Sequence, residues 1–310
     1  MLKLTKYMFL VVASFFLLVG CANTQAQDEA PGETIVITDS QGTQVEVPVN
    51  PQNAVVLDLG TVDSLDYLGV QIAGFPQMIV PKHLEHLKET TADVGGLRSI
   101  DTEAIYALQP DVIFISNRQE DLRDELSQIA PVIFVGIDSD DYLGSLANNL
   151  RTLGQIFTLE AKVEQVVEEL NTRAKQVQEQ ASESNLTALI TMVNETNIGV
   201  FGPTSRFGII HNALGFKAVD ETIEDTTHSM QVNSEYILEK NPDVLFVIDR
   251  QAAIAGEGTA NTVLNNPIIN QTSAALNDRI VYLDSYVWYL VAGGITSTHQ
   301  MIDEVAQVLE

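Results

Sequence analysis

The sequence predicts an α/β protein with two Rossmann-like lobes, which a long rigid helix joins and which face each other across a ligand cleft. Three observations carry this prediction. The segment Asp101–Arg118 returns in similar form at Asn233–Arg250. Each copy reads as a short helix that stops before a proline, then a buried parallel strand, then an arginine. Between the copies, the chain favours helix almost without interruption from Tyr142 to about Ser182.

The repeated segment also predicts where a ligand binds. In open α/β sheets, ligands bind beyond the carboxyl ends of the strands. Arg118 and Arg250 follow the two repeated strands, so each lobe is expected to present a guanidinium at that place. Glu103 and Glu235 lie in the first turn of the two repeated helices, where the helix dipole favours an acid. These acids lie at the far end of the repeated unit and are expected to face outward.

The first twenty residues read as a lipoprotein signal peptide and are excluded from the fold. Lys3 and Lys6 precede an apolar stretch, Met8–Val19, that is too short to span a bilayer comfortably. The stretch runs into Leu-Val-Gly-Cys, which resembles the bacterial lipoprotein signal, so we expect Cys21 to carry a lipid anchor. Cys21 is the only cysteine, which excludes an internal disulfide. Residues 21–33 are small and polar and are expected to form a flexible tether.

The chain is strongly acidic, with a formal net charge of −26 at pH 7. Loss of the signal peptide removes Lys3 and Lys6 but no acid, so the mature chain is still more negative. This charge argues against nucleic acid or anionic lipid as a partner, and it makes any cluster of arginines conspicuous. We expect a monomer.

The first lobe is expected to span residues 34–154 and to alternate short apolar strands with helices. Its expected strands are Thr34–Thr38, Gln44–Val47, Ala54–Leu57, Ile72–Phe75, Val112–Ile115 and Val132–Val135. Its expected helices, besides the repeated one, are Asp63–Leu68, Pro81–Glu89 and Glu120–Gln128.

A linker helix over residues 155–184 is expected to hold the lobes apart as a rigid strut, with Gly154 marking a break before it. The second lobe then spans residues 185–310. Its expected strands are Leu186–Val193, Ile198–Phe201, Val244–Ile248 and Ile280–Leu283. Its expected helices are Phe207–Leu214, Ala260–Leu264, Pro267–Ala275 and Thr298–Leu309, with an aromatic loop at Tyr286–Tyr289.

The sequence carries none of the common catalytic motifs: no phosphate-binding loop, dinucleotide fingerprint, hydrolase elbow, HExxH or CxxC. A hydrolase site could be assembled only on paper, from Ser205, His211 or His228, and Asp225. We therefore expect a protein that is not an enzyme.

The histidines do not indicate a dedicated zinc or manganese site, which would need several cleft histidines and carboxylates. His83 and His86 are three residues apart on a charged helix, which is typical of a solvated face. His228 differs, because it stands in a polar loop just before the second repeat copy and therefore near the expected cleft.

Four segments together resemble a known family. They are DLGTVDSLDYLG, GPTSRFGIIHNALGF, HSMQVNSEYILEKNPDVLFVIDR and YLDSYVWYL. With the lipoprotein signal and the two lobes, they resemble the cluster A (class III) substrate-binding proteins of ABC importers. More narrowly, they are similar to the catecholate ferric-siderophore binders of the FatB, CeuE and YclQ type. The resemblance covers the mature chain from about Glu33.

The resemblance implies three cleft arginines, which match Arg118, Arg206 and Arg250 here. It implies a histidine and a tyrosine that ligate iron when the siderophore leaves coordination sites open; these match His228 and Tyr289. Tyr286 is close enough in sequence to be an alternative to Tyr289. It also implies that Glu103 and Glu235 contact the membrane permease, which works with an ATPase subunit at the inner membrane.

The chemistry agrees with this assignment. A ferric tris-catecholate carries three negative charges, and arginine stays charged where lysine often does not. Each guanidinium can give a two-pronged contact to catecholate oxygens, and phenolate and imidazole suit the hard Fe(III) ion. Trp288 is expected to pack on catechol rings.

The function expected from the sequence is capture of a ferric catecholate siderophore, without any intrinsic cofactor, and its delivery to an ABC permease. The expected location is the periplasm, with the lipid on Cys21 as anchor, or the cell surface if the bacterium is Gram-positive. The alternatives are another iron chelate, such as haem or a mixed or hydroxamate siderophore, or cobalamin.

Overall fold

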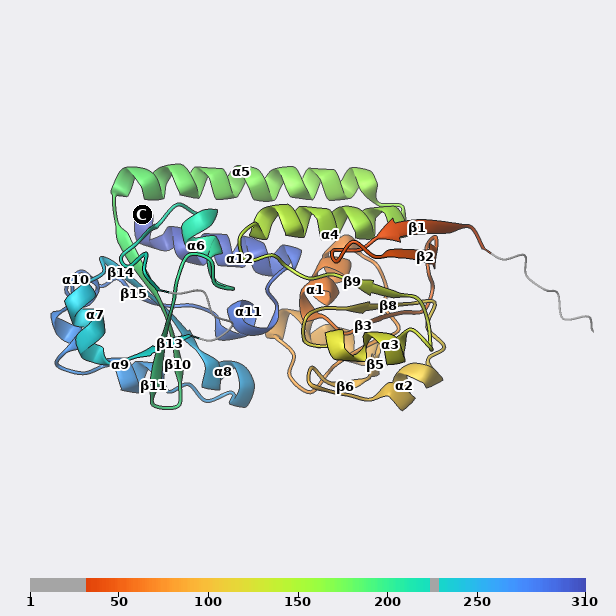
Figure 1. The fold of residues 1–310 in the computed structure, drawn as a ribbon, viewed down its shortest axis with the longest axis horizontal. Helices are drawn as coiled ribbons and strands as arrows, with labels where there is room; N and C mark the ends of the chain where they lie inside the picture. The colour runs from red at the N-terminus through yellow and green to blue at the C-terminus, as the bar shows by residue number, and fades with distance from the viewer. Residues whose placement is uncertain (1–31, 224–228) are drawn as a thin grey trace, which may run out of the picture. The chain divides into compact units, whose positions relative to one another are not determined.

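The structure is a computed structural model that describes residues 32–223 and 229–310. Residues Glu33–Glu310 form one compact unit. Within this unit, two sheets each carry their own helices (Figure 1). The predicted α/β architecture with two sheet-centred lobes is therefore confirmed.

The first lobe is built on a five-stranded sheet in which every paired strand is parallel, in the order β5-β4-β3-β8-β9. Its central strands are buried along their whole length, as expected for a parallel sheet that is covered on both faces. The strands are β3 (Ala54–Val56), β4 (Gly74–Phe75), β5 (Ala92–Asp93), β8 (Val112–Ile115) and β9 (Val132–Phe134).

Two antiparallel hairpins accompany this sheet. One pairs β1 (Thr34–Thr38) with β2 (Gln44–Pro48), as the sequence predicts, and turns through Gly42 at a positive φ of 80°. The other pairs β6 (Gly95–Gly96) with β7 (Ser99–Ile100). The helices of the first lobe are α1 (Leu59–Leu68), η1 (Lys82–Glu89), α2 (Thr102–Ala107), η2 (Glu120–Leu122) and α3 (Arg123–Leu126).

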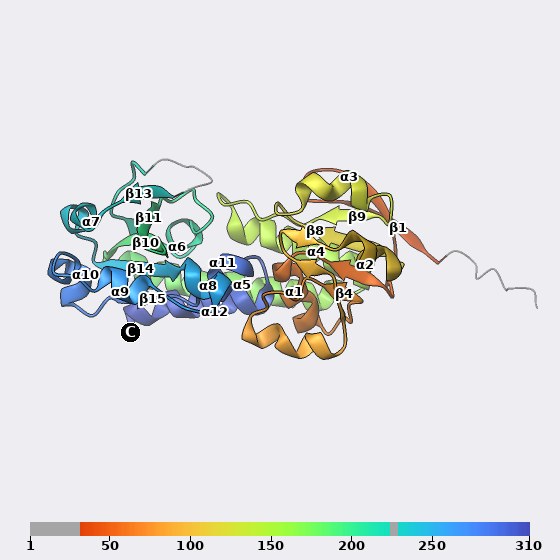
Figure 2. The ribbon, with the colours of Figure 1, turned by 90° about the horizontal axis from the view of Figure 1, so that it is seen from below.

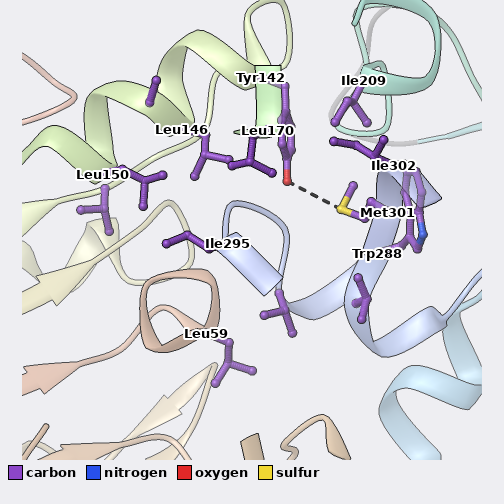
Figure 3. Packing of buried hydrophobic residues seen from close by; sticks show 14 of the residues in the cluster. Leu59, Tyr142, Leu146, Leu150, Leu170, Ile209, Trp288, Ile295, Met301 and Ile302 are labelled. Atoms are coloured by element: carbon purple, nitrogen blue, oxygen red, sulfur yellow. Dashed lines mark hydrogen bonds between the residues drawn. The ribbon is translucent and has the colours of Figure 1, made fainter. Parts of the chain in front are cut away.

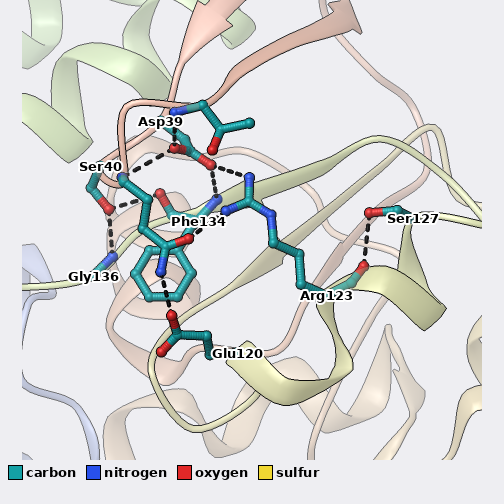
Figure 4. A network of polar contacts seen from close by, with 9 residues as sticks. Asp39, Ser40, Glu120, Arg123, Ser127, Phe134 and Gly136 are labelled. Carbon is teal, nitrogen blue, oxygen red and sulfur yellow. Dashed lines mark hydrogen bonds and ion pairs between the residues drawn. The ribbon is translucent and has the colours of Figure 1, made fainter.

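A polar network fixes the first hairpin to the sheet (Figure 4). The Asp39 carboxylate accepts hydrogen bonds from the Arg123 guanidinium and from the backbone N–H groups of Gln41 and Thr43. Ser40 donates to the Phe134 carbonyl at 2.9 Å, at the end of β9. The hairpin residues Asp39 and Ser40 therefore hold the end of β9 at Phe134, just before residues 135–137.

The helical segment between the lobes consists of α4 (Tyr142–Phe157) and α5 (Glu160–Ser184). The break lies at Thr158, which is left-handed with φ 53°, and not at Gly154 as the sequence suggested. Gly154 instead allows close packing of the two helices, since a Cβ there would lie 3.2 Å from the Val163 side chain. None of the helices in the described ranges is long and apolar enough to cross a membrane.

The second lobe is built on a mixed sheet in the order β13-β11-β10-β14-β15, with β12 also paired to β10. Strands β10, β14 and β15 are parallel, whereas β11 is antiparallel to both of its neighbours. The strands are β10 (Thr187–Asn194), β11 (Asn197–Phe201), β12 (Lys217–Ala218), β13 (Met230–Val232), β14 (Val244–Asp249) and β15 (Ile280–Tyr282).

The expected aromatic loop of the second lobe is a helix, α11 (Ser285–Leu290). Asp284 starts it, because its carboxylate accepts from the backbone N–H groups of Tyr286 and Val287. The other helices are α6 (Ile209–Asn212), α7 (Ser234–Lys240), α8 (Arg250–Ala255), α9 (Ala260–Leu264), η3 (Ile269–Gln271), α10 (Ser273–Leu276), α12 (Ile295–Ala306) and η4 (Gln307–Leu309).

The two repeat copies form the same unit, α2 with β8 and α7 with β14. The aspartate that follows the proline has one role in both. Asp111 accepts from the backbone N–H groups of Gln52 and Asn53, at the start of β3. Asp243 accepts from the backbone N–H and the hydroxyl of Thr187, at the start of β10. Each aspartate thus fixes the neighbouring parallel strand in register.

One hydrophobic cluster runs through both lobes (Figure 3). Tyr142 of α4, Leu170 of α5 and Met301 of α12 meet in it, with the Tyr142 hydroxyl 3.6 Å from the Met301 sulfur. Helix α12 packs against α1 of the first lobe as well as against α5. Helix α11 lies between the two sheets in both views (Figures 1 and 2). The chain between α11 and α12 therefore joins the lobes through packed core.

Candidate functional site

A pocket of about 620 Å³ lies between the lobes, in the size range of small-molecule sites. Its first-lobe wall comes from the segments that follow β8 and β9, including Arg118 and Ile137. Its second-lobe wall comes from the loop after β11, including Arg206, and from Leu290 at the end of α11 and Ala292 just after it. The pocket thus lies beyond the carboxyl ends of the strands, where open α/β sheets bind ligands.

Two arginines from opposite lobes meet at one backbone oxygen. Arg118 Nη2 donates to the Tyr289 carbonyl at 2.8 Å, and Arg206 Nη2 donates to the same carbonyl at 2.9 Å. Tyr289 lies in the last turn of α11, where carbonyl groups lack helical partners and attract cations. The carbonyl holds both guanidinium groups at the pocket.

Arg250 approaches the other end of the same residue. Its Nε donates to the Tyr289 hydroxyl at 2.9 Å, and its Nη1 donates to Asn194 Oδ1 at 2.9 Å. The guanidinium groups of Arg206 and Arg250 lie 5.0 and 5.6 Å from the centre of the Tyr289 ring, within cation–π range. The three predicted arginines therefore converge on Tyr289, although Arg250 is not among the residues that line the pocket.

The clustering of positive charge acts on Arg206 itself. The Arg206 side chain is exposed at the pocket, but desolvation by the surrounding protein and the nearby charges of Arg118 and Arg98 lower the pKa of Arg206 to about 10. The Tyr289 side chain offsets part of this effect. Arg206 remains protonated at neutral pH, and an anion in the pocket would relieve the repulsion between the cations.

Arg98 is a fourth cation of the site that sequence reasoning missed. It lines the pocket from the turn of the β6–β7 hairpin. Gln119, which is only 1% exposed, donates to the Leu97 carbonyl at 2.8 Å and so ties this turn to the end of β8. The sequence marks a loop at Gly95-Gly96 but carries no signal that the loop returns to the cleft.

The expectation that Trp288 packs on the ligand is wrong. Its side chain is 0% exposed, and its indole N–H donates to Glu304 at 2.8 Å. Since α11 is a helix, Trp288 and Tyr289 point to different sides of it. Trp288 faces the core, and Tyr289 meets the arginines.

Tyr142 lines the pocket from α4 although its side chain is only 4% exposed. Burial, with the charges of Asp63 and Asp58, raises the pKa of Tyr142 to about 12. The backbone N–H of Gly293 donates to its hydroxyl at 2.8 Å, and Thr298 Oγ1 lies 3.1 Å from that oxygen. Tyr142 therefore anchors the segment between α11 and α12 beside the pocket.

The two outward acids lie where the repeat predicted them. Glu103 is in the first turn of α2 and Glu235 in the first turn of α7, and both are exposed. Within the described ranges, neither acid forms an ion pair.

Three residues named from the sequence, Cys21, Asp225 and His228, lie outside the described residues. The remaining partners of a hydrolase site do not come together: Ser205 donates to the Gly202 carbonyl at 2.7 Å, and His211 Nδ1 binds the Phe216 carbonyl at 2.8 Å. Across residues 32–223 and 229–310, no group of three or more histidine, cysteine or acidic side chains is placed to hold a metal.

His83 and His86 each face an aspartate of α1. His86 Nε2 lies 3.0 Å from Asp66, on the exposed side. His83 Nε2 lies 3.5 Å from the fully buried Asp63, so the expectation of a purely solvated face is wrong for His83.

Comparison with known proteins places this geometry in a family context. A model of the periplasmic binding protein family (Peripla_BP_2) matches residues 55–287. The chain is 36% identical to the petrobactin-binding protein YclQ of Bacillus subtilis, over 100% of both proteins. It is 32% identical to the ferric-anguibactin-binding protein FatB of Vibrio anguillarum, over 96% of this chain and 95% of FatB.

The solved structures give the same result for the fold. The crystal structure of YclQ superposes with a TM-score of 0.87 at 39% identity, over 90% of this chain and 99% of YclQ. The periplasmic catecholate-siderophore binding protein VctP of Vibrio cholerae superposes with a TM-score of 0.84 at 30% identity, over 88% of this chain and 99% of VctP.

Proposed function

Because the chain belongs to the periplasmic binding protein family, we propose that it captures an anionic ferric catecholate siderophore and delivers it to the permease of an ABC importer. The observation that carries this proposal is the convergence of Arg118, Arg206 and Arg250 on Tyr289, next to a pocket between the lobes. The activity is capture and release, without a chemical step.

Electrostatics supports an anionic ligand. The chain as a whole carries a formal charge of −26, so long-range attraction does not favour an anion. Binding must therefore depend on the local cluster of guanidinium groups, which stay charged when water is excluded and bind oxygen anions in two-pronged geometry. The names of the relatives agree with this chemistry, since they bind petrobactin, ferric anguibactin and catecholate siderophores.

Tyr289, together with His228, is proposed as an iron ligand when the siderophore leaves coordination sites open. A metal-bound phenolate oxygen still accepts a hydrogen bond, so Arg250 can keep its contact with this oxygen in the complex. His228 is included on the sequence resemblance alone.

The permease and ATPase of the importer are proposed as partners, with Glu103 and Glu235 as docking residues, one on each lobe. Their support is that both acids are exposed and stand on equivalent helices of the repeated unit. We further propose that a lipid on Cys21 anchors the protein on the periplasmic side of a membrane, or at the cell surface of a Gram-positive bacterium.

The experiment is a titration of the mature protein with ferric, metal-free and linear catecholates, monitored by Trp288 fluorescence and by colour. Trp288 is the only tryptophan and is adjacent in the chain to Tyr289, so it reports on this site. We expect saturable quenching by micromolar ferric tris-catecholate and little by a neutral ferric hydroxamate, haem or cobalamin. No quenching by wild type, with R118A, R206A and R250A all behaving as wild type, would refute the proposal.

A further inference from the structure

The pocket contains acids as well as arginines. Asp58 and Asp121 line it together with Arg98, Arg118 and Arg206. Two carboxylates would repel a ligand that carries only negative charge, and at close range such repulsion costs several kcal/mol. The presence of these two carboxylates therefore indicates that the ligand carries another recognised group besides its anionic oxygens.

Asp58 is held in a way that leaves half of its carboxylate available. The residue is 8% exposed, and its Oδ2 accepts from the backbone N–H of Thr61 at 2.9 Å and from the Thr61 hydroxyl at 3.0 Å. Among the residues that the structure describes, no donor reaches Oδ1, and no cationic side chain lies within 4 Å of the carboxylate.

The N-terminal capping of α1 does not explain why residue 58 is a charged aspartate. Asp58 is the N-cap of this helix, but serine, threonine or asparagine caps a helix about as well without a charge. A carboxylate that is more than nine-tenths buried and lacks a cationic partner is costly. Asp58 lines the pocket between the lobes, where a bound ligand could supply that partner.

We infer that the natural ligand is a ferric chelate that carries a protonated amine in addition to its anionic oxygens. The amine would donate to Asp58 Oδ1 in the pocket, while the arginines bind the catecholate oxygens. Asp121, which is exposed, would add a weaker and more screened attraction for the same cation. This inference rests on the proposed function and narrows its ligand class.

The test uses two chelates that differ in one charge: ferric bis-(dihydroxybenzoyl)spermidine, whose free secondary amine is protonated, and its N-acetyl derivative. For wild type, we expect the amine form to bind about tenfold more tightly, the range of a hydrogen bond to a charged group. In D58N, the amide oxygen still caps α1, and the preference should fall to about twofold or less, with the acetylated chelate bound at least as well as by wild type.

D101N is the matched control, because Asp101 caps α2 in the same manner, with its carboxylate accepting from Ala104 at 2.9 Å, but does not line the pocket. It should keep the wild-type preference. The inference is overturned if wild type binds both chelates equally, or if D58N keeps the full preference for the amine. Failure of wild type to bind any ferric catecholate would instead remove the proposed function, and this inference with it.

Discussion

The two repeat copies share a backbone plan but give their arginines different tasks. In the first copy, Arg118 lies in the loop after β8, lines the pocket and donates to the Tyr289 carbonyl. In the second, Arg250 begins α8 directly after β14 and is held by Asn194 and the Tyr289 hydroxyl. The repeat thus sets where each arginine leaves its strand. The segment that follows differs between the copies, so that Arg118 lines the pocket whereas Arg250 is held by the Tyr289 hydroxyl and Asn194.

The largest expected effect is on ligand affinity, and it should distinguish the role of Arg118 from that of Arg250. R118A and R206A each remove a cation that lines the pocket, and we expect ferric tris-catecholate affinity to fall about a hundredfold. R250A should cost only about tenfold, because it loosens Tyr289 without emptying the pocket of charge. Dissociation constants from Trp288 fluorescence measure both.

K175A is a suitable control for these variants, since Lys175 is an exposed cation on α5 that does not line this pocket. It should bind as wild type does. Equal losses of affinity in R118A and R250A would show that the two arginines contribute equally to binding. That result would contradict the different roles inferred from their contacts.

The second prediction concerns stability, where the copies also differ. Asp220 pairs with Lys240 at the end of α7 at 2.7 Å and accepts from the Tyr236 hydroxyl at 2.7 Å. No such ion pair holds α2 within the described part of the chain. D220N should lower the free energy of unfolding by about 2 kcal/mol at pH 7, as measured by urea denaturation. E221Q, the exposed neighbouring acid, is the control and should have little effect.

The stability that Asp220 contributes should also depend on pH. The hydrogen bonds from Lys240 and Thr222 hold the pKa of Asp220 well below its usual value of 3.8. A depressed carboxyl pKa stabilises the fold above the unfolded-state value, and this contribution is lost as pH falls toward the folded-state value. The difference between wild type and D220N should therefore shrink below pH 4. A constant difference from pH 7 to pH 2.5 would contradict this origin.

The third and smaller effect is expected from Y289F. The carbonyl that holds Arg118 and Arg206 is unchanged, and only Arg250 loses an acceptor. Affinity for a coordinatively saturated ferric tris-catecholate should fall about fivefold. A ferric bis-catecholate should lose more, and its visible absorption should shift, if Tyr289 ligates iron. Equal losses for both chelates would argue against that role.

The sequence predicted best those parts of the site that belong to the repeated segment. The repeated strands and the outward acids lie as predicted, and the family resemblance is confirmed. Of the two repeat arginines, Arg118 lines the pocket as predicted, whereas Arg250 does not line it. Trp288 was misjudged because the segment was read as a loop; Asp284 was the capping signal for a helix that turns Trp288 inward. Arg98 and Tyr142 could not be found, because only tertiary packing brings their segments to the pocket.

The smallest effect on ligand affinity is expected for the acids at the far end of the two copies. Glu103 and Glu235 are exposed and do not line the pocket, so E103Q and E235Q should change chelate affinity less than about twofold. If they dock to the permease, siderophore-dependent growth should fall in each variant and most in the double variant, while E160Q, in the first turn of α5, should grow normally. Because binding and uptake are measured separately, a loss of both would mean damage to the fold. If neither binding nor uptake falls, Glu103 and Glu235 only stabilise their helices. The two copies would then be equivalent at their outer ends but different at the pocket.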